Sequence, residues 1–161
     1  KVVTGATWRQ SPAALDPGIK SLNYLNNILA KIEGQQAGAQ EVILLNPQGM
    51  VSECSGDNIF FIRNGALVTP KLSSGALNGI TRATVLEIAR QAKWETREDD
   101  VRRYDLFTCD EMFLTGTGAE IVPVVEVDGR PIGDGRPGKR TADLMKRYRK
   151  LVSTTGTKIP A

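Results

Sequence analysis

The sequence of 161 residues contains no histidine and only two cysteines, Cys54 and Cys109. Without histidine, neither a Ser-His or Cys-His catalytic pair nor a zinc site is expected, and the two cysteines lack metal-ligand spacing. We therefore expect no metal site and a reducing, cytoplasmic setting in which both thiols stay free. Proton transfer near neutral pH must then use lysine, a carboxylate, tyrosine or a cofactor.

Long apolar runs and strong charge are also missing. No stretch approaches the roughly 18 apolar residues of a membrane span, and no signal peptide is visible. The net charge of +3 is too small and scattered to indicate nucleic-acid binding. The basic stretch from Lys139 to Lys150 suits the solvated face of a helix, the alternative being a polyanion site. The chain begins with Lys1 rather than Met, so we expect a piece of a longer protein, processing being the alternative.

What is present is an ordinary globular composition, with 40% hydrophobic and 24% charged residues, enough for a single domain with a core. Alternation over residues 1–11 suggests a strand. From Ser21 to Gln36 apolar residues recur at helical spacing, and Gly38 is a plausible stop. Four β-prone segments follow with turn signals between them: Glu41–Asn46, Met50–Glu53, Asn58–Arg63 and Ala66–Thr69.

The second half mixes helical and extended patterns. We expect helices over residues 79–92 and 141–152, strands over 95–101, 111–115 and 121–127, a helical turn over 104–109, and a frayed end from Thr154 to Ala161. So much antiparallel pairing does not fit a doubly wound parallel fold. The pattern predicts an α+β domain with a mixed, mostly antiparallel sheet and packed helices.

Two segments could bind an anion on physical grounds. Gly79-Ile80-Thr81 opens a helix, where free amides and the positive end of the dipole face outward, although Thr81 could simply cap that helix. Thr115-Gly116-Thr117-Gly118-Ala119 follows a strand and offers small residues and hydroxyls, although a plain tight turn would look similar. Neither segment is a P-loop or a dinucleotide fingerprint.

Five segments, in order, cover nearly the whole chain. They are Lys20-Ser21-Leu22-Asn23-Tyr24-Leu25, Ser52 to Phe60 (SECSGDNIF), Leu77 to Arg82 (LNGITR), Asp110 to Glu120 (DEMFLTGTGAE) and Val127-Asp128-Gly129-Arg130 continuing to Gly138. Together they resemble the branched-chain (class IV) family of pyridoxal-phosphate-dependent aminotransferases, and the first is similar to that family's lysine segment.

The resemblance implies roles for individual residues. Lys20 would be the Schiff-base lysine that also moves the substrate proton, and Glu53 would pair with the pyridine nitrogen. The remaining roles would be Tyr24 at the 3-oxygen, Leu77 against the ring, Gly79, Ile80, Thr81 and Thr117 at the phosphate, and Gly118 and Ala119 at the substrate carboxylate. Taken alone, Lys20 and Glu53 would pass for surface residues, and Tyr24 for part of a packed helix start.

Four positions depart from the family pattern: Cys54 stands where Gly is usual, Asp57 for Glu, Gly118 for Ala and Lys139 for Pro. Cys54 matters most because it lies beside Glu53 and could alter that turn. The resemblance also implies the large-domain fold of fold-type-IV enzymes, with a barrel-like core, over residues 1–161 as a single domain. The family's smaller N-terminal domain is not in this sequence, so we expect little turnover from the 161 residues alone.

The function that the resemblance implies is transamination between the branched-chain L-amino acids Leu, Ile and Val and 2-oxoglutarate, with pyridoxal 5′-phosphate as cofactor. The full-length protein would be a homodimer or a higher homo-oligomer. A D-amino-acid aminotransferase or an aminodeoxychorismate lyase could use the same motifs. A non-catalytic binding domain would be expected to have lost Lys20 or Glu53, and both are present.

Overall fold

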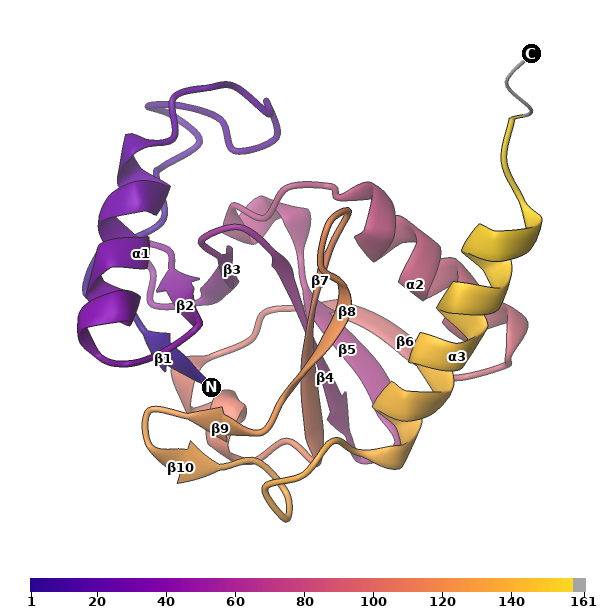
Figure 1. The fold of residues 1–161 in the computed structure, drawn as a ribbon. Helices are drawn as coiled ribbons and strands as arrows, with labels where there is room; N and C mark the ends of the chain where they lie inside the picture. The colour runs from indigo at the N-terminus through magenta and orange to yellow at the C-terminus, as the bar shows by residue number, and fades with distance from the viewer. Residues whose placement is uncertain (158–161) are drawn as a thin grey trace.

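The computed structural model describes residues 1–157, and in this part of the chain two five-stranded sheets pack face to face between helices (Figure 1). The first sheet has the strand order β10-β9-β1-β2-β3 and the second the order β6-β5-β4-β7-β8. The strands are β1 (Val2–Thr4), β2 (Glu41–Leu45), β3 (Val51–Cys54), β4 (Asn58–Arg63), β5 (Ala66–Pro70), β6 (Thr96–Asp99), β7 (Glu111–Gly116), β8 (Glu120–Val124), β9 (Glu126–Val127) and β10 (Arg130–Pro131).

Three α-helices and two 3₁₀ turns complete the described residues: α1 (Leu25–Gln36), α2 (Ile80–Gln91), α3 (Lys139–Thr154), η1 (Leu72–Ser74) and η2 (Arg103–Phe107). Helix α1 covers the outer face of the first sheet, whereas α2 and α3 cover the outer face of the second (Figure 1). The layers are therefore helix, sheet, sheet and helices.

Strand β4 shows how one sequence serves two cores. Ile59 and Phe61 point into the core between the sheets, while Phe60 and Ile62 point toward α2 and α3. The Phe60 ring stacks on Phe113 of β7 with centroids 5.1 Å apart. Because both faces of the second sheet are covered, its central strands have continuous apolar runs rather than alternation.

The predicted α+β class is confirmed, and antiparallel pairings predominate. The parallel pairs are β1 with β2, β1 with β9, and β5 with β6. The described strands do not close a barrel, because β3, β10, β6 and β8 remain edge strands of two open sheets. The barrel-like core that the resemblance implied is instead a face-to-face sandwich of two open sheets.

The first strand is shorter than the alternation over residues 1–11 predicted. The Glu33 carboxylate of α1 accepts hydrogen bonds from the Ala6 amide at 2.7 Å and the Thr7 amide at 3.2 Å. These bonds replace sheet pairing, so the strand ends at Thr4. Most other boundaries lie within three residues of the predicted ones. At the C-terminus α3 includes Thr154, and residues 158–161 of the segment expected to fray lie outside the described residues.

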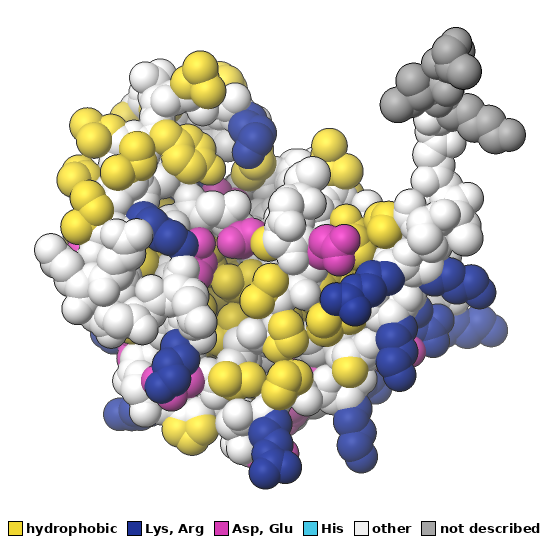
Figure 2. Space-filling model, viewed as in Figure 1, with side chains coloured by type: hydrophobic (Ala, Val, Ile, Leu, Met, Phe, Trp, Pro, Cys, Tyr) yellow, Lys and Arg dark blue, Asp and Glu magenta, His cyan; other side chains and the backbone are white. Residues whose placement is uncertain are grey.

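Helix α1 corrects the predicted start, and the structure adds which face of the helix is buried. It begins at Leu25 rather than Ser21, and Lys20 to Tyr24 form a loop. Its apolar stripe does not face the sheet: Leu25 is 68% exposed, and Ile28 and Leu29 are each 50% exposed. Figure 2 shows hydrophobic side chains gathered over this end of the molecule. The buried face instead consists of Asn27, Ala30 and Gly34.

Gly34 sets the distance between α1 and the first sheet. A Cβ atom at this position would lie 2.4 Å from Cγ2 of Val42 in β2, too close for any real contact. Alanine at position 34 must therefore push α1 and β2 apart, although alanine favours a helix over glycine by about 1 kcal/mol. Since α1 follows directly on the loop that contains Lys20, this contact also positions the site.

We expect Gly34→Ala to lower the free energy of unfolding by about 1–3 kcal/mol, the usual cost of overpacking. In a Val42→Ala background, where the clashing methyl groups are gone, the same substitution should be neutral or stabilising by up to about 1 kcal/mol. Urea denaturation of the four proteins in this double-mutant cycle measures the coupling. Equal effects of Gly34→Ala in the two backgrounds would show that the helix does not rest on Val42.

Candidate active site

A cavity opens where the Lys20 loop, β3, the start of α2 and the end of β7 meet. Its volume is about 260 Å³, just below the roughly 300–1,000 Å³ of typical small-molecule pockets. A second pocket adjoins it and shares Lys20, Tyr24, Glu53 and Leu77. The cavity is lined by Lys20, Tyr24, Glu53, Gly56, Asp57, Asn58, Leu77, Asn78, Gly79, Ile80, Thr81, Thr115, Gly116 and Thr117. Residues widely separated in the sequence therefore meet at one place.

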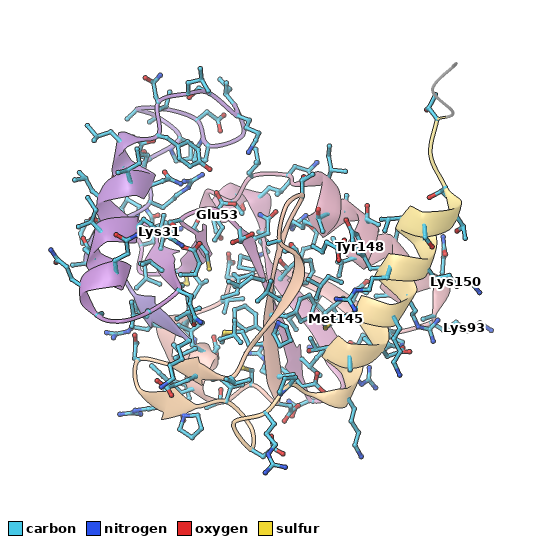
Figure 3. All side chains as sticks on the ribbon, in the orientation of Figure 1. Lys31, Glu53, Lys93, Met145, Tyr148 and Lys150 are labelled. Carbon is cyan, nitrogen blue, oxygen red and sulfur yellow. The ribbon has the colours of Figure 1, made fainter. Side chains whose placement is uncertain are left out.

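Glu53 is the buried acid of this cavity and lies between α1 and the second sheet (Figure 3). One carboxylate oxygen forms an ion pair with Arg9 at 2.5 Å. The other accepts hydrogen bonds from the Asn58 side chain and the Leu77 amide, both at 2.9 Å. Burial raises the pKa of Glu53 above its usual value, and Arg9, the Leu77 amide and Lys20 partly offset that rise.

Arg9 is the partner that sequence analysis missed. Its guanidinium is buried and donates to the Gly75 carbonyl at 2.9 Å and to the Asn27 side chain at 3.2 Å. Asn27 in turn donates to the Ser55 carbonyl at 2.7 Å. Arg9 belongs to no recognisable motif and lies in a loop, so nothing local in the sequence marks it. Asn58 lies inside a motif that sequence analysis quoted, but it was given no role.

The Lys20 side chain lines both the cavity and the adjoining pocket, and its charge is close enough to Glu53 to lower the pKa of that acid. Tyr24 lines the same two spaces and occupies the N-cap position of α1. Tyr24 makes no side-chain cap bond and is 41% exposed, so it does not serve as a packed helix start. The loop therefore presents an amine and a phenol to the cavity.

The start of α2 presents free donors to the cavity. The N-cap residue is Gly79, and no side chain caps the helix, so the alternative role of Thr81 as a cap is wrong. Within the described chain, the amides of Ile80, Thr81 and Arg82 have no hydrogen-bond acceptor. A Cβ atom on Gly79 would lie 2.3 Å from the Asn58 side-chain oxygen, so any larger residue would displace the Asn58 amide that holds Glu53.

Helix α3 provides a contrast. Its first amides are satisfied by the Glu111 carboxylate, which accepts hydrogen bonds from the Arg140 amide at 3.0 Å and the Thr141 amide at 2.7 Å. Glu111 also accepts from the Thr141 hydroxyl at 2.7 Å. The chain thus neutralises one helix start with its own acid and leaves the start of α2 open, as expected for an anion site.

The second glycine-threonine turn lies beside the first. Thr115, near the end of β7, pairs directly with Asn58 of β4, and Gly116 and Thr117 continue along the cavity wall. Gly118 and Ala119 are exposed and do not line the cavity. If they bind the substrate carboxylate, as the resemblance implies, they would do so at the outer rim of the cavity.

Two departures from the family pattern lie near Glu53. Cys54 is buried in the core between the sheets and does not line the cavity, and its amide still closes the turn by donating to the Asp57 carbonyl at 2.8 Å. Asp57 does line the cavity, and burial and the nearby Glu41 raise its pKa. The turn after Glu53 is therefore intact.

Chemically, the cavity combines an amine, a buried carboxylate held by a guanidinium, and a set of open amide donors. Such a set suits an anionic ligand that also carries a basic nitrogen. Within residues 1–157 there is no cluster of side chains suited to a metal ion. No described helix is long and apolar enough to cross a membrane.

Comparison with known proteins gives a consistent result. The model of the amino-transferase class IV family matches residues 1–127. A branched-chain-amino-acid aminotransferase of Pseudomonas aeruginosa is 45% identical over 130 residues, which are 81% of this chain and 42% of that protein.

Among solved structures, the branched-chain amino acid aminotransferase from Escherichia coli superimposes with a TM-score of 0.91 at 36% identity, covering 93% of this chain and 51% of that one. The Thermobaculum terrenum enzyme in its PLP form gives a TM-score of 0.91 at 39% identity, over 94% of this chain and 50% of that one. The chain spans about half the length of these relatives. It belongs to the class IV aminotransferase family.

Proposed function

We propose that the protein containing this chain transfers amino groups between the branched-chain L-amino acids Leu, Ile and Val and 2-oxoglutarate, using pyridoxal 5′-phosphate bound to Lys20. The observation that carries the proposal is that Lys20, Glu53 and the open start of α2 line one cavity. Family membership supports the reaction class, and relatives named as branched-chain aminotransferases support the substrate class. Solved relatives hold pyridoxal or pyridoxamine phosphate.

The residues of the cavity fit this cofactor. Open amides at the start of α2 suit a phosphate, and we assign it to Gly79, Ile80, Thr81 and Thr117. We assign Tyr24 to the 3-oxygen and Leu77 to the ring face. When bound, pyridoxal phosphate supplies an aldehyde that captures amines and a ring that withdraws electrons from the substrate's α-carbon.

Glu53 would hold a proton on the ring nitrogen. Its raised pKa makes the carboxylate a better proton acceptor, while Arg9 keeps it charged. The hydrogen bonds from Asn58 and Leu77 fix its orientation in advance, which is the form of electrostatic preorganisation that stabilises developing charge most effectively.

Lys20 would move the proton at the substrate's α-carbon, because it is the amine of the cavity and the chain has no histidine for this task. The amides of Gly118 and Ala119 would bind the substrate carboxylate at the rim. We further propose a cytoplasmic setting, with Cys54 and Cys109 as free thiols, and a dependence of turnover on the family's small N-terminal domain.

A homo-oligomer is part of this proposal. The apolar stripe of α1 together with Ile19, Leu22 and Trp8 is largely exposed, next to the cavity-lining loop. Exposed apolar patches of this kind favour burial against a partner surface. A second copy seated there would also cover one side of the cavity entrance.

Substrate addition tests the reaction class in the full-length protein. L-leucine should change the cofactor's absorbance spectrum, and 2-oxoglutarate should restore it as each half-reaction proceeds. A response to D-alanine alone would indicate a D-amino-acid aminotransferase, and a response to aminodeoxychorismate alone would indicate a lyase; either outcome refutes the branched-chain assignment.

Lys20→Ala should abolish covalent attachment of the cofactor and lower turnover by at least about 10²–10⁴-fold, the usual contribution of a positioned acid-base group. Borohydride reduction followed by mass spectrometry locates the adduct in the unchanged protein. Lys150→Ala, on the exposed face of α3, is the matched control and should change neither. An adduct on a lysine other than Lys20 would refute the assignment.

Arg9→Met should leave the Glu53 carboxylate buried without its cation, and breaking a buried pair costs about 3–5 kcal/mol. The pKa of Glu53, already raised, should rise further, so the folded state binds a proton more tightly than the unfolded state. The loss of stability should thus be largest above the raised pKa of Glu53 and shrink as the pH falls through that pKa.

Thermal denaturation of the cofactor-free protein from neutral to acid pH measures the effect. Arg97→Met, which breaks an exposed ion pair with Glu95, is the control and should cost little at any pH. A pH-independent loss in Arg9→Met would mean that Arg9 contributes packing rather than charge compensation.

A further inference from the structure

We infer that Thr115 donates a hydrogen bond to the cofactor's phosphate, in addition to the donors assigned above; this inference rests on the proposed function. Thr115 lies near the end of β7, one residue before the glycine of the second turn. It belongs to the segment that the sequence marked as a possible anion site but has no role of its own so far, and it lines the same cavity as the start of α2.

The hydroxyl of Thr115 lacks a partner within the described chain. The residue is 1% exposed, and its Oγ1 atom makes no hydrogen bond. An unsatisfied buried hydroxyl is costly, and buried polar groups are nearly always paired. A group that lines a ligand cavity and lacks a partner in the protein is therefore expected to find one in the ligand.

The position of Thr115 favours the phosphate over the ring nitrogen. Thr115 is the direct cross-strand partner of Asn58, and the Asn58 side-chain oxygen lies under Gly79 at the start of α2. The Thr115 hydroxyl is thus at the base of the cleft between the two glycine-threonine turns. The ring nitrogen already has Glu53, whereas phosphate oxygens accept several hydrogen bonds.

A trapped water is a weaker explanation for this hydroxyl. A buried water needs two to four polar partners. The neighbouring Asn58 amide already donates to the Glu53 carboxylate and to the Leu77 carbonyl, both at 2.9 Å. The open amides at the start of α2 and the Thr115 hydroxyl are all donors, so a ligand group whose oxygens only accept satisfies them better than a single water does.

The test compares Thr115→Val, which keeps the side-chain shape without the hydroxyl, with Thr115→Ser, which keeps the hydroxyl. Ser52→Ala is the matched control, because the Ser52 hydroxyl is also buried and unpartnered but does not line the cavity. Absorbance titrations of the full-length protein with pyridoxal 5′-phosphate and with pyridoxal give the two affinities. Melting temperatures of the cofactor-free proteins are measured alongside.

Thr115→Val should bind pyridoxal 5′-phosphate about tenfold more weakly, the effect of one hydrogen bond to a charged group, and bind pyridoxal unchanged. Its cofactor-free form should melt at the same or a higher temperature, because an unsatisfied group is removed. Thr115→Ser and Ser52→Ala should bind both ligands as the unchanged protein does.

Several results would overturn the inference. Unchanged affinity for pyridoxal 5′-phosphate in Thr115→Val, or an equal loss for pyridoxal, means that the hydroxyl does not contact the phosphate. A lower melting temperature of the cofactor-free Thr115→Val protein means that the hydroxyl serves the fold. Failure of the unchanged protein to bind pyridoxal 5′-phosphate would instead refute the proposed function together with this inference.

Discussion

The buried ion pair between Arg9 and Glu53 is the interaction on which the arrangement of the site depends. Removing two charges from water costs several kcal/mol each, so such a pair persists only where further hydrogen bonds satisfy both groups. Here the guanidinium reaches the Gly75 carbonyl and Asn27 of α1, and the carboxylate binds Asn58 and the Leu77 amide. One pair thereby ties both sheets, α1 and the approach to α2 to a single point.

Helices α2 and α3 both pack on the second sheet, but only the start of α2 is left open for a ligand. Helix α3 is closed by Glu111, whose carboxylate accepts three hydrogen bonds from the first turn. Helix α2 has a glycine at its cap and no such acid. Because the two helices pack on the same sheet, the difference reflects the side chains placed near them. An acid beside Gly79 would compete with any anionic ligand for the same amides.

Much of this could be predicted from sequence. Periodicity and turn signals located most helices and strands, and the motifs indicated both glycine-threonine turns and the acid that meet in the cavity. Arg9 could not be found in this way, because its role depends on pairing with Glu53, which is far away in the sequence. The exposure of the apolar stripe of α1 could not be predicted, since helical spacing identifies an apolar face but not the chain that covers it. Thr115 lay inside a segment that the sequence marked as a possible anion site, but its own role could not be assigned, because the missing partner of its hydroxyl is visible only in three dimensions.

The open amides of α2 and the unpaired Thr115 hydroxyl also bear on the lifetime of the protein in a cell. A buried hydroxyl without a partner lowers the stability of the form without ligand, and a ligand that binds only the folded state, at these donors, stabilises that state by mass action. Small losses of stability expose proteins to proteases and change their steady-state abundance several-fold. Under the proposed function, the amount of this protein should therefore follow the supply of pyridoxal phosphate.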